Sequence, residues 1–117
     1  MIPAPIKPTV DIADLDKLDI RVGTIISVTE VASSNKLMKL TVDFGDHRRS
    51  ILTGIRQERE NPDEIEGLQA LFVINLPARE MAGQASEGML FDIGYADGVT
   101  PVLAVAGKPV ANGARAG

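Results

Sequence analysis

The chain has 117 residues, of which 44% are hydrophobic and 24% charged, values typical of one globular domain rather than a disordered chain. It contains no cysteine, which excludes disulfides and thiolate metal sites. Taken alone, its net charge of −4 counts against nucleic acid as a partner, because phosphate binding needs a positive surface.

Neither a signal peptide nor a membrane span is expected. The N-terminus lacks a basic patch followed by an apolar run, and no apolar run approaches the ~18 residues of a spanning helix. We therefore expect a cytoplasmic protein without a membrane partner. Aromatic residues make up only 3%, so the core must be aliphatic and a base-stacking platform would be poor.

Residues 1–13 are expected to form an N-terminal arm, and residues 14–117 a single domain. The arm carries three prolines, and Asp11 is suited to cap a short helix or turn over residues 11–18. A first strand is expected at residues 20–31, where Gly23 indicates a bulge or a sharp bend. Alternation places four apolar side chains of this strand on one face: Ile20, Val22, Ile26 and Val28.

The middle of the chain predicts a strand meander followed by a short helix. Residues 37–45 alternate cleanly, and a hairpin leads from them to a third strand at residues 48–52. Asn61 followed by Pro62 is suited to start a helix of about two turns that ends at Gly67. The inward side chains of the second strand are expected to be Met38, Leu40, Val42 and Phe44.

Three more apolar strands are expected after this helix, at residues 68–76, 88–93 and 99–106, with a polar loop before the second of them. This order is that of an all-β, five-stranded OB-fold barrel with a short helix between strands 3 and 4. An SH3-like barrel is the main alternative. The last strand exceeds what five-stranded closure needs and is too apolar to leave bare, so we expect a C-terminal extension used for dimerisation.

Basic residues gather in the second quarter of the chain. Residues 36–59 carry three more cations than acids, whereas acids cluster at residues 11–19 and 60–66. A locally basic face on an acidic body would suit phosphate contacts, and solvated strand faces are the alternative explanation. The cations of this stretch are Lys36, Lys39, Arg48, Arg49, Arg56 and Arg59.

The sequence offers little for catalysis. His47 is the only histidine and is expected to be a surface residue of a hairpin turn. No serine has a histidine placed to activate it, apart from the slim case of His47. The motifs of zinc proteases, P-loops and dinucleotide-binding turns are absent. We therefore expect a protein that is not an enzyme, without catalytic residues, metal or cofactor.

Five short motifs follow one another along the chain: residues 19–23 (DIRVG), 35–40 (NKLMKL), 53–55 (TGI), 75–90 (NLPAREMAGQASEGML) and 109–114 (PVANGA). Their order and spacing resemble the stand-alone tRNA-binding domain family. This family includes the domain appended to methionyl- and phenylalanyl-tRNA synthetases and the CsaA export chaperones. The resemblance covers about residues 14–115, which is nearly the whole chain.

The resemblance implies an OB-fold homodimer, formed through the C-terminal extension, that binds tRNA near the outer corner of its L shape without reading base sequence. It also implies an aminoacyl-tRNA synthetase as a partner, and a chain with only this domain suggests a free-standing protein. The CsaA branch implies an alternative, a chaperone that binds unfolded export clients in a groove near Met81, Met89 and Leu90. A pure assembly module that docks onto a synthetase is a third interpretation.

Within these motifs, Lys36, Arg79 and Ser86 take the positions of the family's RNA contacts, and two cations and a hydroxyl suit phosphate and ribose. Each has a plain alternative: Lys36 is simply solvated, Arg79 pairs with Glu80 or Glu87, and Ser86 caps the backbone at a strand start. Four further residues complete the expected RNA-binding stripe, namely Asn35, Lys39, Arg48 and Arg49.

Two positions depart from the family pattern. Glu80 and Ala82 stand where the family has basic residues. Each lost phosphate contact weakens binding and lowers its salt dependence. We therefore expect weak tRNA binding, and the sequence leaves open whether RNA or peptide is the ligand.

Overall fold

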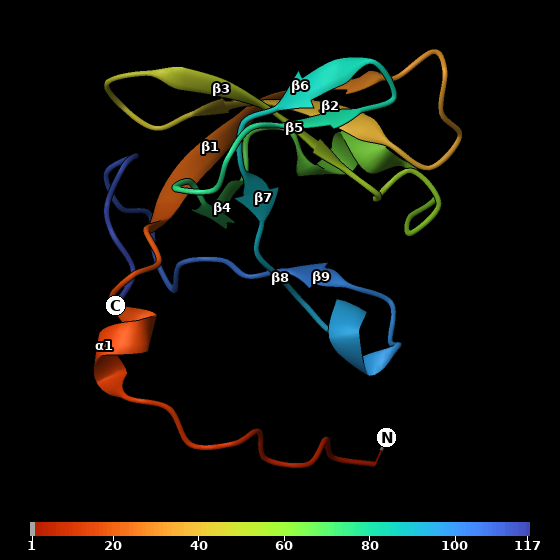
Figure 1. Ribbon diagram of the computed structural model, residues 1–117. Coiled ribbons are helices and arrows are strands. Elements are labelled where there is room, and N and C mark those ends of the chain that lie inside the picture. The colour runs from red at the N-terminus through yellow and green to blue at the C-terminus, as the bar shows by residue number, and fades with distance from the viewer. Residues whose placement is uncertain (1) are drawn as a thin grey trace.

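The computed structural model describes residues 2–117, so Met1, the first residue of the expected arm, lies outside the described residues. Regular structure is nearly all β, with one helical turn, α1 (Ile12–Leu15), and two 3-10 turns, η1 (Pro62–Ile65) and η2 (Tyr95–Asp97) (Figure 1). The strands are β1 (Ile20–Glu30), β2 (Met38–Asp43), β3 (Arg48–Thr53), β4 (Gln69–Val73), β5 (Arg79–Met81), β6 (Gln84–Ser86), β7 (Met89–Leu90), β8 (Asp92–Ile93) and β9 (Val102–Leu103).

Five strands form one antiparallel sheet in the order β3-β2-β1-β4-β7, which curls into a half-barrel (Figure 1). Its two edges meet just before β7. There the Glu87 N–H donates to the Ser50 carbonyl at 2.8 Å, and the Leu52 N–H donates to the Ser86 hydroxyl at 3.0 Å. These bonds tie the last strand of the sheet to β3. The structure thus confirms the predicted all-β, five-stranded OB-fold with a helical turn between β3 and β4.

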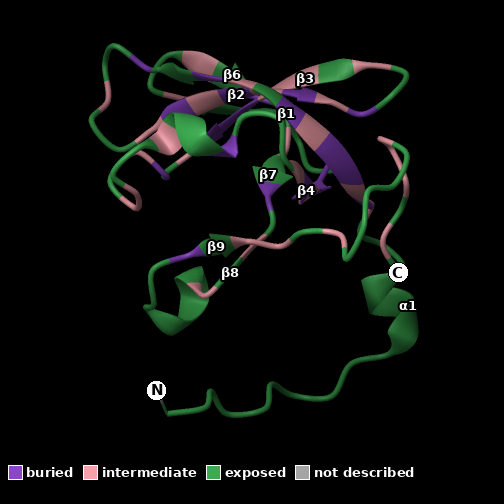
Figure 2. Ribbon diagram, turned by 180° about the vertical axis from the view of Figure 1, so that it is seen from behind, coloured by how far each residue is buried: buried purple, intermediate pink, exposed green. Residues whose placement is uncertain are grey.

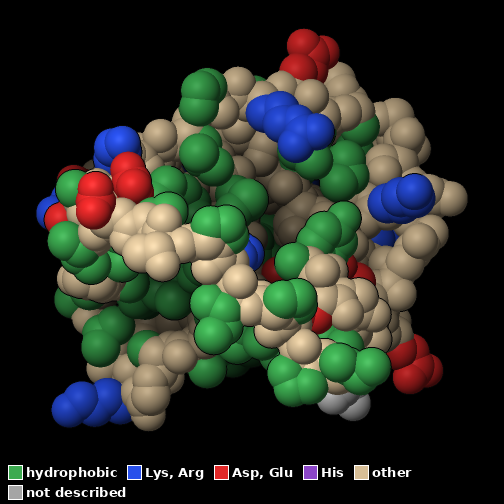
Figure 3. Space-filling view, turned by 60° about the horizontal axis from the view of Figure 1, so that its bottom comes forward, with side chains coloured by type: hydrophobic (Ala, Val, Ile, Leu, Met, Phe, Trp, Pro, Cys, Tyr) green, Lys and Arg blue, Asp and Glu red, His purple; other side chains and the backbone are tan. Residues whose placement is uncertain are grey.

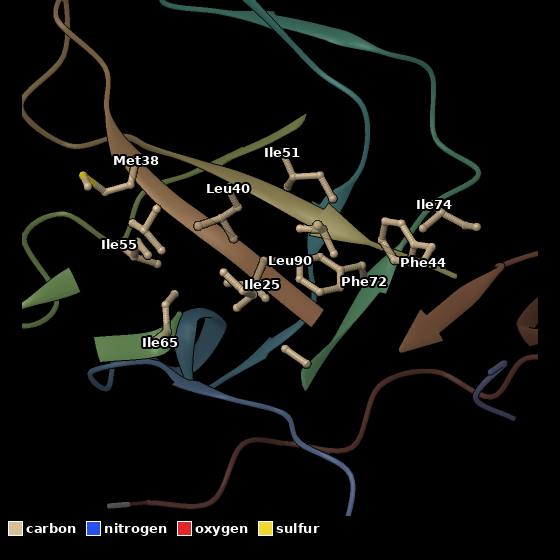
Figure 4. Packing of buried hydrophobic residues seen from close by; sticks show 13 residues of the cluster. Ile25, Met38, Leu40, Phe44, Ile51, Ile55, Ile65, Phe72, Ile74 and Leu90 are labelled. Atoms are coloured by element: carbon tan, nitrogen blue, oxygen red, sulfur yellow. The ribbon is translucent and has the colours of Figure 1, made fainter. Parts of the chain in front are cut away.

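Strict alternation along β2 fills the barrel with aliphatic side chains. Met38, Leu40 and Val42 are buried, as predicted. Phe44 is buried beside them and packs edge-to-face against Phe72, with the ring centroids 5.5 Å apart. Figure 4 shows these side chains converging from several strands on one core. This core makes the barrel a rigid scaffold for the loops that connect its strands.

Of the four side chains predicted to point inward from β1, Ile20, Val22 and Val28 are buried, and Ile26 alone is not. A β-bulge after Ile25 shifts the register against β2, so Ile25 is fully buried and Ile26 is 40% exposed. Gly23 is not the bulged residue. It allows close packing against β2, because a Cβ at this position would lie 2.5 Å from Cγ1 of Val42. The bulge thus exchanges Ile25 for Ile26 on the buried face, and the predicted alternation resumes at Val28.

The helix between β3 and β4 is shorter than predicted. It is the single 3-10 turn η1, and the Asn61 side chain makes no capping hydrogen bond. The buried side chain of Ile65 anchors the turn to the core, so packing rather than capping fixes its place. One turn is enough to carry the chain across the end of the barrel.

The chain leaves the barrel after β7, and the two last predicted strands are therefore wrong in extent. Residues 88–93 split into β7 and β8, and residues 99–106 reduce to β9, which pairs with β8 in a separate two-stranded ladder. Gly94 has φ +104 and begins η2 between them. The polar loop expected before β7 contains a second small hairpin, β5–β6.

The N-terminal arm, α1 and the β8–β9 ladder lie on one side of the barrel, below it in Figure 1, and Figure 2 shows the same arrangement from behind. Residues 2–10 are extended and exposed throughout. Among residues 2–117, no helix is long and apolar enough to cross a lipid bilayer.

Candidate nucleic-acid interface

A groove of about 560 Å³ opens where the loops around β3 face the β5–β6 hairpin and η2. Its rim carries the two cations singled out by the sequence, Lys36 and Arg79. Its other lining residues are Leu37, Leu52, Thr53, Gly54, Glu58, Met81, Met89, Leu90, Phe91, Asp92, Gly94, Tyr95, Ala96 and Asp97. The groove is therefore apolar on its floor and charged, with both signs, at its edges.

Lys36 is presented by a well-bonded turn between β1 and β2. The Ser34 hydroxyl oxygen accepts hydrogen bonds from the backbone N–H groups of Lys36 and Leu37, each at 3.1 Å. The Lys36 carbonyl accepts a bond from the Arg56 N–H at 3.1 Å, and the Arg56 guanidinium donates to the Ser34 carbonyl at 2.6 Å. These bonds fix the backbone while the lysine side chain stays exposed.

Arg79 is presented by the hairpin β5–β6, in which it lies opposite Ser86. The two residues of the tight turn, Ala82 and Gly83, have φ +49 and φ +79, as two-residue hairpins with the strand twist require. The Ser33 hydroxyl donates to the Ala82 carbonyl at 3.1 Å. This bond links the turn that carries Lys36 to the hairpin that carries Arg79.

Neither groove cation is neutralised by its own chain within residues 2–117. Both side chains are exposed, and neither takes part in an ion pair there. The pairing of Arg79 with Glu87 is not formed, because the Glu87 carboxylate accepts a bond from the Ser50 N–H at 3.0 Å. Both positive charges are thus available to a ligand in the groove.

Two other expected RNA contacts are engaged inside the fold. Ser86 is buried, and its hydroxyl accepts from Leu52 N–H and donates to the Gly88 carbonyl at 3.2 Å. The Arg49 guanidinium donates to the carbonyls of Ile74 at 2.6 Å and Glu87 at 2.9 Å. Both residues therefore hold the barrel seam together and offer little to RNA.

The remaining members of the expected stripe lie outside the groove. Asn35 is exposed in the same turn as Lys36. Lys39 is half-buried on β2, and Arg48 is exposed at the start of β3, opposite Asp43. His47 is half-buried in the β2–β3 hairpin, stacks on Phe44 and contacts Asp46 at 2.6 Å. The structure therefore gathers two of the seven expected RNA contacts at one groove.

The residues expected for peptide binding line the same groove. Met89 is exposed, Met81 is half-buried, and Leu90 is buried at the floor. The two ligand classes considered from the sequence therefore converge on a single place in the fold. Its apolar floor suits side chains or stacked bases, and its basic rim suits phosphates or carboxylates.

Three further lining residues were missed by sequence analysis. Tyr95 is 74% exposed at η2 and offers an aromatic face. Burial raises the pKa of Glu58, and the nearby charge of Asp92 raises it further. Burial likewise raises the pKa of Asp92. The negative charges of these two carboxylates oppose the cations of the rim. Glu58 and Asp92 come close only because β8 leaves the barrel, and no motif in the sequence indicates this.

Comparison with known proteins places this fold in a family. The family model described as "Putative tRNA binding domain" matches residues 20–115. The chain belongs to the tRNA-binding domain family. Methionine–tRNA ligase from Parabacteroides distasonis is 37% identical to this tRNA-binding domain over 99 residues, which are 85% of this chain and 14% of the ligase. The chain thus spans only a small part of this curated relative.

Two solved structures resemble the tRNA-binding domain over nearly their whole length. The MetRS related protein from Pyrococcus horikoshii has a TM-score of 0.85 at 34% identity, covering 94% of this chain and 99% of that one. The chaperone CsaA from Bacillus anthracis has a TM-score of 0.80 at 26% identity, covering 94% of this chain and 100% of that one. The resemblances expected from the sequence motifs are confirmed.

Proposed function

We propose that this domain binds tRNA through phosphate contacts at the groove rim, as a non-catalytic accessory to translation in the cytoplasm. One observation carries the proposal: Lys36 and Arg79, 43 positions apart in the sequence, lie at one groove and are joined through the Ser33–Ala82 hydrogen bond. The likeness to part of a methionine–tRNA ligase supports a tRNA synthetase as a partner.

The groove has only two cations against three carboxylates, Glu58, Asp92 and Asp97, which implies weak binding that reads shape rather than sequence. Phosphate contacts position a protein on RNA without specifying bases. A folded tRNA should therefore be preferred over an unfolded RNA of the same length, while different tRNA species should bind alike.

The test is a binding titration of the full chain with a mixture of folded tRNAs at low salt. We expect micromolar, salt-sensitive binding that is weaker for the same RNA kept unfolded. Absence of binding at low salt, or equal binding of folded and unfolded RNA, would contradict the proposal. Lys108→Ala is the control variant for general charge. Lys108 is exposed and lies outside the groove, so its removal should leave tRNA affinity almost unchanged.

Peptide binding is the second candidate, favoured by the apolar floor of Met81, Met89 and Leu90 and by the likeness to a CsaA chaperone. Suppressed aggregation of an unfolded client, lost in Met81→Ser and unaffected by excess tRNA, would make peptide the ligand. Unchanged aggregation would remove this candidate.

We also propose that the chain forms a homodimer through its C-terminal extension. The support is the exposed apolar surface of this extension, which includes Val99, Val105 and Val110. Exposed apolar patches of this kind mark interaction sites in folded proteins.

A further inference from the structure

The N-terminal arm, residues 2–10, touches little of its own chain. Ile2 is 91% and Ile6 99% exposed, and Val10 is largely exposed as well. No hydrogen bond joins residues 2–10 to the rest of the described chain. The arm therefore holds three large aliphatic side chains in water, which is unfavourable unless a partner covers them.

The arm is built to stay extended. Pro3, Pro5 and Pro8 fix φ and favour extended or polyproline conformations. Such a segment loses little conformational entropy when it docks, because few conformations were open to it beforehand. Nine extended residues span about 30 Å. This length is comparable with the shortest dimension of the molecule, 30 Å.

The same side of the molecule offers a matching apolar surface, which we call the lower face. It is formed by Ile12 and Leu15 of α1 and by Ile93 and Val102 of the β8–β9 ladder, all of which are exposed. Figure 1 shows the arm, α1 and the ladder on this side of the barrel. Figure 3 shows hydrophobic side chains gathered over the lower side, with basic side chains set apart from one another.

One chain thus carries both an apolar arm and an apolar surface, and its own arm leaves that surface uncovered. A two-fold interface needs surfaces that complement themselves, so that an element of one copy meets a site on the other and the reverse. The arm and the lower face meet this requirement. The family match begins at Ile20, so the arm lies outside the part of the chain that the family shares.

We propose that the arm is exchanged between two copies of this chain, with Ile2, Ile6 and Val10 packing on the partner copy's lower face near its Val102. This inference rests on the proposed homodimer and adds a second contact between its two copies, made by the exchanged arms. Each copy then covers apolar side chains that the other leaves in water.

The first experiment measures dimer dissociation by sedimentation for the full chain and for the triple variant Ile2→Ser, Ile6→Ser, Val10→Ser. We expect the triple variant to raise the dissociation constant about tenfold or more, since each side chain loses its burial. The matched control, Lys7→Ala with Thr9→Ser, alters the same arm without touching its apolar residues and should leave the constant unchanged.

The outcomes separate the two proposals. A parent chain that stays monomeric overturns both the homodimer and the exchanged arm. A dimer that is equally tight in the parent and the triple variant leaves the homodimer standing and overturns the arm.

The second experiment uses the lack of native cysteine. Equimolar Ile6→Cys and Val102→Cys chains are mixed and oxidised, and we expect a covalent dimer on a denaturing, non-reducing gel. Ile6→Cys mixed with Ala85→Cys, whose cysteine lies on the β5–β6 hairpin, is the control and should give far less. A disulfide formed within one chain by the double variant Ile6→Cys, Val102→Cys, in place of the dimer, overturns the exchange, because the arm then lies on its own lower face.

Discussion

Most arginines of this chain bind carbonyl or carboxylate groups of the chain itself. Such structural cations differ from those whose charge is available to a ligand. Arg49 joins two carbonyls at the barrel seam, and Arg56 holds the turn of Lys36 and pairs with Glu30 at 3.2 Å. Arg79 has no such partner within residues 2–117. Residue type alone therefore does not reveal which cation can bind a ligand.

Arg79→Ala should lower tRNA affinity, whereas Arg49→Ala should lower the stability of the fold. Arg79→Ala should lower tRNA affinity about three- to tenfold through loss of one charged contact, without change in stability. Arg49→Ala should cost about 1–3 kcal/mol of unfolding free energy, because two seam carbonyls lose a donor. RNA titration and urea unfolding of both variants check this contrast, and equal RNA affinity of parent and Arg79→Ala would remove Arg79 from the site.

Glu58 should weaken RNA binding as the pH rises. Its raised pKa means that the folded protein keeps this proton to higher pH than the unfolded chain does. Charging the carboxyl therefore costs stability as the pH rises above the ordinary glutamate pKa of about 4.3, and it also repels phosphates.

Glu58→Gln should consequently increase stability near neutral pH and strengthen tRNA binding about two- to fivefold. Titrations at acidic and neutral pH should show the parent losing more affinity on the way up than Glu58→Gln. Glu60→Gln, which removes an exposed acid outside the groove, is the matched control. If Glu60→Gln strengthens binding as much as Glu58→Gln does, net charge rather than the groove is responsible.

At the scale of elements, the β5–β6 hairpin positions Arg79 through a strained turn. Ala82 has φ +49, a left-handed conformation that costs an L residue roughly 1–2 kcal/mol. Ala82→Gly should therefore raise the unfolding free energy by about 0.5–1 kcal/mol. Ala85→Gly on the adjoining strand should lower it, because glycine weakens strands. Thermal unfolding of both variants tests this, and destabilisation by Ala82→Gly would refute the strain.

Sequence reasoning succeeded where alternation was regular and failed where the chain departed from it. The period of two along β2 predicted that Met38, Leu40 and Val42 point inward, and they do. The bulge in β1 was expected at Gly23 and lies after Ile25, because one inserted residue leaves no mark on composition that would fix its position. The separate β8–β9 ladder was missed because residues 88–93 look like one strand in the sequence, whereas β7 ends at Leu90 and β8 pairs with β9 outside the barrel.

The site was predicted in part for the same reason. Motif positions identified Lys36 and Arg79, which the fold brings together. The same motifs also indicated Ser86, whose hydroxyl is used inside the barrel. Glu58 and Asp92 share the groove only because β8 turns away from the sheet, so their opposing charge follows from tertiary structure.

At the scale of the whole molecule, a polar clamp fastens the C-terminal segment to the barrel. The Asp19 carboxylate accepts bonds from Arg21 at 2.9 Å and from Arg115 at 3.1 Å. The Arg21 bond holds the pKa of Asp19 below its ordinary value, burial opposes this, and Arg115 adds to the lowering. The folded state therefore binds this proton less readily than the unfolded chain does.

The clamp should consequently weaken in acid. Its contribution is present above the ordinary aspartate pKa of about 3.9 and is lost as the pH falls through the lower folded value. Asp19→Asn should be less stable than the parent at neutral pH, and the two should converge in strong acid. Urea midpoints across this range test the sign, with Asp11→Asn as the control, and a constant difference would contradict the clamp.

The whole chain is acidic, with a net charge of −4, so binding depends on where its free cations lie. The most direct test is the salt dependence of tRNA affinity for the parent and for the double variant Lys36→Ala, Arg79→Ala. Two lost phosphate contacts should reduce the slope of log affinity against log salt by about one and a half units. An unchanged slope in the double variant would contradict tRNA binding at this groove.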